Sequence, residues 1–179
     1  MRCRALVLGG VAVMALSACD QLQKPERKTE AGTPAAKKDD ARFRYSLSED
    51  AAGDYEPLQP LQVGEWRLDQ IFIAGPHSFE NWISVDASRP TQAPLKMVLS
   101  GNNGELTLAP GRFDINERHV RFEGKSPLTG DYRFDGQIDL DALAEARRQL
   151  GSQEAVLKGR LEIGGRSFNN LEFKIKTGG

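Results

Sequence analysis

The sequence predicts a mainly β protein: an antiparallel barrel or sandwich of about eight to ten short strands, with one helix near residues 140–150. Short segments alternate apolar and polar residues, which is typical of half-buried strands. The 18 glycines favour many turns, and only one segment has the apolar spacing of an amphipathic helix. A long amphipathic sheet must curl onto itself or split into two packed layers, and the pattern leaves both open.

The first 19 residues have the three-part build of a secretory signal. Arg2 and Arg4 precede an apolar run that is too short to span a bilayer. The run ends in Leu16-Ser17-Ala18-Cys19, which resembles the lipobox of bacterial lipoprotein precursors. This resemblance implies that residues 1–18 are removed and that Cys19 carries a diacylglycerol, with a further acyl chain such as palmitate on its amino group. The alternative is an ordinary signal peptide with a chance cysteine.

Residue Asp20 resembles the signal that retains some lipoproteins in the inner membrane of enteric bacteria. The resemblance therefore implies the periplasmic face of the inner membrane in preference to the outer membrane. Residues 19–41 are predicted to be the lipidated cysteine and a flexible tether, because the stretch has few apolar residues to bury. Residues 42–179 are predicted to form a single β-rich domain, and we expect residues 65–177 to fold alone.

The charge of the chain excludes some classes of function. Removing residues 1–18 leaves 22 basic against 25 acidic residues, a formal charge of −3, which is not that of a nucleic-acid-binding protein. Cys3 is discarded with the signal, so no thiol other than that of Cys19 remains for a disulfide or a cysteine metal site.

Strand patterns run through most of the domain. A first strand is expected at 42–47 and a loop at 48–64, where Pro57 and Pro60 occur. About nine strands follow from Glu65. Their predicted ranges are 65–73, 79–85, 95–99, 106–108, 113–115, 120–122, 132–138, 157–163 and 171–175. In the 79–85 strand, Phe79 faces the core and Trp82 faces outward.

The helix near 140–150 has Asp139 or Asp141 to cap its first turn and Gly151 to end it. The closing hairpin turns around Gly164-Gly165, either through a two-residue loop with a bulge near Asn169-Asn170 or through a three-residue loop that includes Arg166. The three-residue loop is preferred, because it needs no irregularity.

Two strand glycines, Gly136 and Gly159, have the parity of inward-facing residues. They indicate either a kink in the sheet or space left for a ligand, and the kink is favoured because it is the commoner reason for a glycine within a strand.

No motif for a nucleophile, phosphate loop, dinucleotide or zinc site occurs in the sequence. His77 and His119 are expected on the surface. Asp135, Gln137, Asp139 and Asp141 begin like a calcium loop, but the later positions fail, since Leu140 stands where such a loop has glycine. We therefore expect no enzyme activity, no cofactor and no bound metal.

Four aromatic residues are bunched in two neighbouring predicted strands: Trp66, Phe72, Phe79 and Trp82. The simplest interpretation is that Trp66 and Phe79 are core residues. The functional hypothesis is that Trp82 belongs to a platform for an apolar or sugar-like ligand, or for a partner protein. The expected function is a non-enzymatic binding or assembly module of the cell envelope, attached to the membrane through its lipid. The alternatives are a barrel that carries a lipid or small apolar ligand, and a small hydrolase that uses a carboxylate pair.

Overall fold

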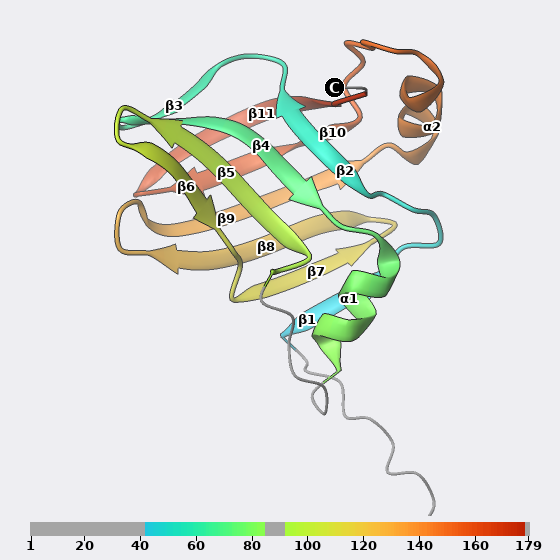
Figure 1. Cartoon of the computed structure of the whole chain (residues 1–179), viewed down its shortest axis with the longest axis horizontal. Helices are drawn as coiled ribbons and strands as arrows, with labels where there is room; N and C mark the ends of the chain where they lie inside the picture. The colour runs from blue at the N-terminus through green and yellow to red at the C-terminus, as the bar shows by residue number, and fades with distance from the viewer. Residues whose placement is uncertain (1–41, 85–91, 178–179) are drawn as a thin grey trace, which may run out of the picture. The chain divides into compact units, whose positions relative to one another are not determined.

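The β prediction is confirmed, with one curled sheet in place of two packed layers. The computed structural model describes residues 42–84 and 92–177, and there the chain forms eleven strands and two helices (Figure 1). The strands are β1 Phe43–Ser46, β2 Gly53–Pro57, β3 Leu61–Val63, β4 Trp66–Ile73, β5 Leu95–Gly101, β6 Gly104–Leu108, β7 Arg112–Asn116, β8 His119–Ser126, β9 Gly130–Ile138, β10 Leu157–Ile163 and β11 Arg166–Ile175. The helices are α1 Pro76–Ile83 and α2 Leu140–Arg148.

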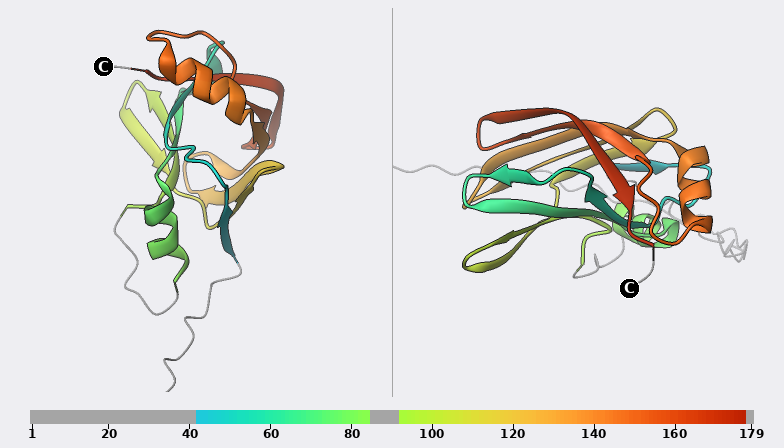
Figure 2. Two further views of the ribbon diagram at one scale, coloured as in Figure 1. Left: turned by 90° about the vertical axis from the view of Figure 1, so that its right-hand side faces the viewer. Right: turned by 90° about the horizontal axis from the view of Figure 1, so that it is seen from above.

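Across the sheet the strands lie in the order β1-β7-β8-β9-β10-β11-β2-β4-β5-β6, and β3 pairs with β4 beside β2. The sheet curls as an open half-barrel, with β1 and β6 at the two ends of this path (Figure 2). The expectation of a purely antiparallel sheet was wrong at one edge, because β1 runs parallel to β7.

The inner face of the curled sheet holds the hydrophobic core. Large side chains from most strands are fully buried there, which matches the alternating pattern of the sequence. They include Tyr55, Leu68, Ile71, Ile73, Leu95, Met97, Leu99, Phe113, Phe122, Phe134 and Phe173. In the described residues, neither helix is long and apolar enough to cross a membrane.

Strand β2 joins the two halves of the sheet. Its residues pair with β11 through Tyr55 and Pro57, and with β4 through Gly53 and Tyr55. Tyr55 is fully buried, and its hydroxyl donates a 2.6 Å hydrogen bond to the Ala51 carbonyl. The predicted loop at 48–64 was therefore wrong, because β2 and β3 both lie in that range and occupy successive parts of one edge of β4.

Helix α1 lies where the sequence predicted a strand at 79–85. Proline at the first position of the helix presets its backbone angle, and Phe79 is the residue it buries completely. Trp82 is half-buried against the core, with its ring 6.1 Å from that of Phe43 in an edge-to-face contact. The outward placement of Trp82 was wrong because a helix brings residues three apart to the same side, whereas a strand alternates them. Val85, the last residue of that predicted strand, lies outside the described residues.

Helix α2 confirms the prediction for residues 140–150. The Asp139 carboxylate accepts a 3.0 Å hydrogen bond from the Ala142 amide, the cap expected from the sequence. Arg147 fastens the helix to the β1–β2 connection, because its guanidinium donates 2.7 Å hydrogen bonds to the carbonyls of Asp50 and Ala52. The same connection contacts the β7–β8 turn, because the Ser48 backbone amide donates a hydrogen bond to the Glu117 carboxylate. This hydrogen bond lowers the pKa of the Glu117 carboxyl.

The closing hairpin has the two-residue loop, and the preferred prediction of a three-residue loop was wrong. Ile163 pairs with Arg166, so the loop is Gly164-Gly165, and both glycines have positive φ angles of 58° and 75°. Two positive φ angles are what the tight turn matching the twist of a hairpin requires. Phe168 therefore lies opposite Leu161, and a bulge follows.

At the bulge, Asn169 and Asn170 stand opposite Arg160, and Asn170 has a φ of 54°. Asparagine tolerates this left-handed conformation better than most residues. Beyond the bulge Gly159 pairs with Leu171 and Leu157 with Phe173, as predicted.

Gly136 and Gly159 face each other across β9 and β10. A Cβ atom added to Gly159 would lie 2.7 Å from the Asp135 carbonyl oxygen and 2.7 Å from the Phe134 ring, and one on Gly136 would lie 2.5 Å from the Lys158 carbonyl oxygen. The inner space beside both glycines is thus filled by the Phe134 ring and by backbone. The two glycines therefore allow close packing within a bent sheet, as favoured from the sequence, and they do not line an internal ligand cavity.

The close packing of Gly136 and Gly159 can be tested by substitution. We expect Gly159→Ala to lower the free energy of unfolding by about 1 to 3 kcal/mol, because rigid backbone must move to admit the methyl group. Gly111→Ala is the control, since a Cβ there meets nothing within 4 Å; it should change stability by less than about 0.5 kcal/mol. Urea unfolding of the two variants measures the difference, and equal stabilities would show that the glycine pair is not tightly packed.

Whether the sheet folds without β2 can be tested by truncating the chain. A chain that starts at residue 65 lacks β1, β2 and β3, so β11 and β4 lose the strand between them. We expect this chain to show no cooperative thermal unfolding, whereas a chain that starts at residue 42 should unfold in one transition. Circular dichroism on heating compares them. A cooperative transition in the shorter chain would restore the expectation that residues 65–177 fold alone.

Candidate functional site: a charged groove on the outer face

The outer face of β8 to β11 carries an open groove of about 560 Å³. We call it the outer groove. It is lined by the polar and charged side chains of Arg118, His119, Arg121, Asp135, Gln137, Lys158, Arg160, Asn169, Asn170 and Glu172, together with Gly136, Gly159 and Leu171. Four arginine or lysine side chains and two carboxylates line it. Arg121, Lys158 and Arg160 each pair with a carboxylate, and Arg118 is the cation of this set that has no ion pair in the described residues.

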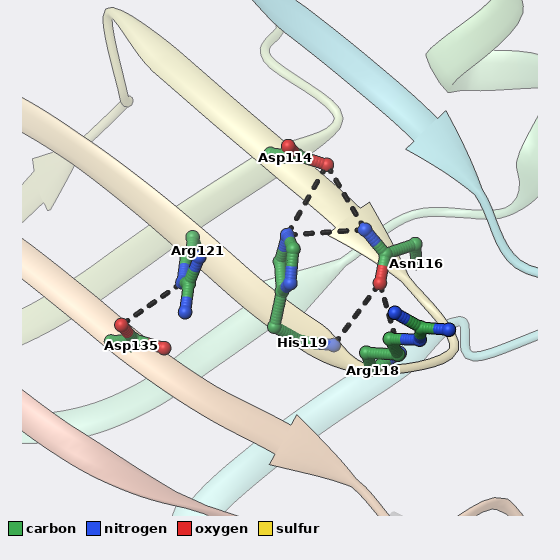
Figure 3. A network of polar contacts seen from close by, with 6 residues as sticks. All are labelled: Asp114, Asn116, Arg118, His119, Arg121 and Asp135. Carbon is green, nitrogen blue, oxygen red and sulfur yellow. Dashed lines mark hydrogen bonds and ion pairs between the residues drawn. The ribbon is translucent and has the colours of Figure 1, made fainter.

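At one end of the outer groove, the β7–β8 turn holds His119 in place (Figure 3). The Asn116 side-chain carbonyl accepts hydrogen bonds from the amides of Arg118 (2.9 Å) and His119 (3.3 Å), which fixes the turn. His119 Nε2 lies 3.4 Å from Asp114 Oδ1 and 3.1 Å from Asn116 Nδ2. His119 Nε2 can donate to the carboxylate in one tautomer and accept from the amide in the other, so the ring has a partner in either tautomer.

Most charges in the outer groove pair across neighbouring strands. Arg121 Nε donates a 2.9 Å hydrogen bond to Asp135 Oδ2, which lies directly opposite on β9 (Figure 3). Lys158 Nζ is 3.4 Å from Glu172 Oε1, again between residues that face each other. Exposed pairs of this kind contribute little to stability, about 0 to 1 kcal/mol each, so a ligand can replace one partner at small cost.

Several polar groups of the outer groove are left for a ligand. Arg118 is exposed, and its guanidinium makes no ion pair or hydrogen bond within residues 42–84 and 92–177. The same holds there for the side-chain amides of Gln137, Asn169 and Asn170. The bulge puts the two asparagines side by side opposite Arg160, where a regular strand would place one outward residue. Cationic and amide donors therefore gather in one groove.

The residues singled out from the sequence are not brought together. Trp66 is buried at the start of β4, and its ring lies against Gly101. Phe79 and Trp82 are on α1, which follows the other end of β4, so a strand about 25 Å long separates them from Trp66.

Phe79 is fully buried, stacked on Tyr45 with ring centroids 4.1 Å apart. The preferred interpretation that Trp66 and Phe79 belong to the core is therefore confirmed. The alternative of a platform led by Trp82 would need these rings on one surface, whereas Trp66 and Phe79 are buried and Trp82 is half-buried against the core. Cys19 and Asp20 lie outside the described residues.

The outer groove was missed by sequence reasoning except through Gly136 and Gly159. His119 was expected on an exposed strand face, but its side chain is only 19% exposed. The signal that could have located the groove is the Asn169-Asn170 pair in the hairpin, because two adjacent asparagines in a strand suit a bulge. His77, by contrast, is 95% exposed on α1, and in the described residues its ring has one polar partner, Glu80, with His77 Nδ1 3.1 Å from Glu80 Oε2.

Two of the acidic residues considered for a calcium loop, Asp135 and Asp139, have separate partners. Asp135 pairs with Arg121, and Asp139 caps α2. The two carboxylates that line the outer groove, Asp135 and Glu172, each face a cation across the sheet. No cluster of three potential metal ligands occurs in the part of the chain that the structure describes.

Comparisons with protein-family models, with curated proteins and with solved structures found no significant match.

Proposed function

We propose that this chain is a lipid-anchored binding module of the bacterial cell envelope that holds an anionic ligand in the outer groove. The observation that carries the proposal is the surplus of cations over carboxylates among the residues that line the groove, led by Arg118, which has no ion pair within residues 42–84 and 92–177, on a chain with a net negative charge. Such an arrangement attracts anions locally while the rest of the surface repels them.

The chemistry of the outer groove suits binding better than catalysis. Its cations and amides donate hydrogen bonds, and planar guanidinium groups match carboxylate or phosphate geometry. The exposed ion pairs of Arg121 and Lys158 can exchange their protein carboxylates for those of a ligand at small cost. The glycine pair and the bulge hold these donors on a rigid sheet and not on a loop, so little ordering is needed when a ligand binds.

The anchor in the proposal rests on the lipobox-like residues 16–19, and Asp20 is the basis for proposing the periplasmic face of the inner membrane. More than one acyl chain gives stable attachment, since a single chain binds only marginally. The proposed module would therefore sample ligands near the membrane surface and not throughout the periplasm.

A test of the anchor is Cys19→Ser, which removes the sulfur that takes the diacylglycerol. We expect wild-type protein to enter the detergent phase on Triton X-114 partitioning and the variant to lose the mass of the acyl chains. Ser17→Ala is the control, because it keeps a small residue and the cysteine. Equal masses for Cys19→Ser and wild type would contradict acylation at this position.

A test of the outer groove uses a fluorescent hexaglutamate peptide as a polyanion probe. We expect Arg118→Gln and Lys158→Gln each to weaken binding about fivefold, equivalent to about 1 kcal/mol, and binding to fall as salt rises. Fluorescence anisotropy measures the affinities. Both substitutions are at exposed positions, so the fold should be unchanged.

The matched control is Arg44→Gln on β1. Arg44 is also exposed and has no ion pair in the described parts of the chain, but it does not line the groove. It should bind the probe as wild type does. If all three variants lose affinity equally, the attraction comes from net charge alone and the groove is not the site.

A further inference from the structure

One residue of the outer groove, His119, belongs to the residue type that changes charge near neutral pH. Histidine gains its positive charge between about pH 8 and pH 5, a range in which exposed lysine, arginine and carboxylate groups keep theirs. His119 and Arg121 lie two residues apart on β8, so both side chains are on the outer face of the sheet, where both line the groove. His77, the other histidine of the chain, is on α1 and does not line it.

The imidazole of His119 is held through Nε2, whereas Nδ1 is accessible (Figure 3). Nε2 lies 3.1 Å from the Asn116 side-chain nitrogen and 3.4 Å from Asp114 Oδ1. Nδ1 has no hydrogen-bond partner within residues 42–84 and 92–177, and it is not among the unpartnered polar atoms that the protein shields from solvent there. A ligand in the outer groove can therefore reach Nδ1.

Protonation changes the charge of the ring without releasing it. In the neutral ring, Nε2 accepts a hydrogen bond from Asn116, whose side-chain carbonyl is fixed by the amides of Arg118 and His119. In the protonated ring, Nε2 donates to Asp114, and the Asn116 side-chain nitrogen keeps Asp114 Oδ1 as a partner at 3.3 Å. The ring thus presents an Nδ1–H donor in both states, and the protonated state adds one positive charge to the groove.

The charged groups around His119 couple its protonation to the ligand. They come from its own strand and from the elements on both sides: Asp114 on β7 with Arg44 beside it on β1, Glu117 and Arg118 in the β7–β8 turn, Arg121 on β8, Asp135 on β9 and Lys158 on β10. Without ligand, the cations of this set oppose a further positive charge on the ring. An anionic ligand offsets that repulsion, so the ligand and the proton each favour the binding of the other.

We propose that His119 contacts the anionic ligand of the outer groove and that its protonation strengthens binding as the pH falls. Nδ1–H donates a hydrogen bond to an anionic oxygen of the ligand, and this bond becomes charge-assisted from both sides when the ring is protonated. The inference rests on the proposed function, because it concerns the same groove.

The test uses the full chain in a nonionic detergent and a fluorescent peptide of six cysteic acids, whose sulfonates stay charged across this pH range. At constant ionic strength, we expect wild type to bind the probe about threefold to fivefold more tightly at about pH 5.5 than at about pH 8. His119→Gln should bind equally at both, because glutamine cannot gain a charge. His77→Gln, the matched control, should keep the wild-type pH dependence. Fluorescence anisotropy measures the affinities.

A second variant makes the test independent of the stability of the first. His119→Lys carries its charge at both pH values, so at about pH 8 it should bind the probe as tightly as wild type does at about pH 5.5. The inference is overturned if wild type shows no pH dependence, if the dependence persists in His119→Gln or is lost in His77→Gln, or if His119→Lys gains no affinity. Should Arg118→Gln still weaken binding at about pH 8 in any of these cases, the proposed function stands alone. No binding of the probe at either pH would overturn both.

Discussion

The sheet depends on the pairing of one short strand on both of its edges. Strand β2 has only five residues, yet it is the link between the half of the sheet that ends at β11 and the half that begins at β4. Its pairings are extended by hydrogen bonds from the Lys176 amide to the Asp54 carbonyl and from the Leu58 amide to the Glu172 carbonyl. Buried Tyr55 holds the middle of the strand, so the two halves share one core.

Much of the sheet could be predicted from the sequence, because strands with one buried face alternate apolar and polar residues. Strands β7 to β10 follow that alternation, and the α2 cap is fixed by the local chemistry of Asp139. Strand β2 could not be recognised, since Pro57 and Pro60 are strong turn signals. The structure accommodates Pro57 at the last position of the strand, and Pro60 in the break between β2 and β3.

The other differences between the predicted and the observed elements occur where two local conformations of the chain have nearly equal free energy. Residues 79–83 fit a strand by alternation, but Pro76 at the start of α1 favours a helix, and packing of Phe79 against Tyr45 and Phe113 decides the outcome. In the hairpin, the turn geometry of Gly164-Gly165 outweighs the cost of a bulge. The outer groove could not be predicted for the same reason: it depends on that bulge and on contacts between four strands that no single segment encodes.

The long sequence separation between β2 and its partner β11 also determines when the protein can fold. Its partner β11 ends at Ile175, and Pro57 pairs with Phe173 across more than a hundred residues. During synthesis, β2 and β4 can pair early, but the sheet cannot be completed until β11 has emerged. Contacts of such long sequence separation make folding slow. The unfinished chain exposes the apolar faces of β4 and β5 during that interval, so its passage to the native state depends on protection from aggregation.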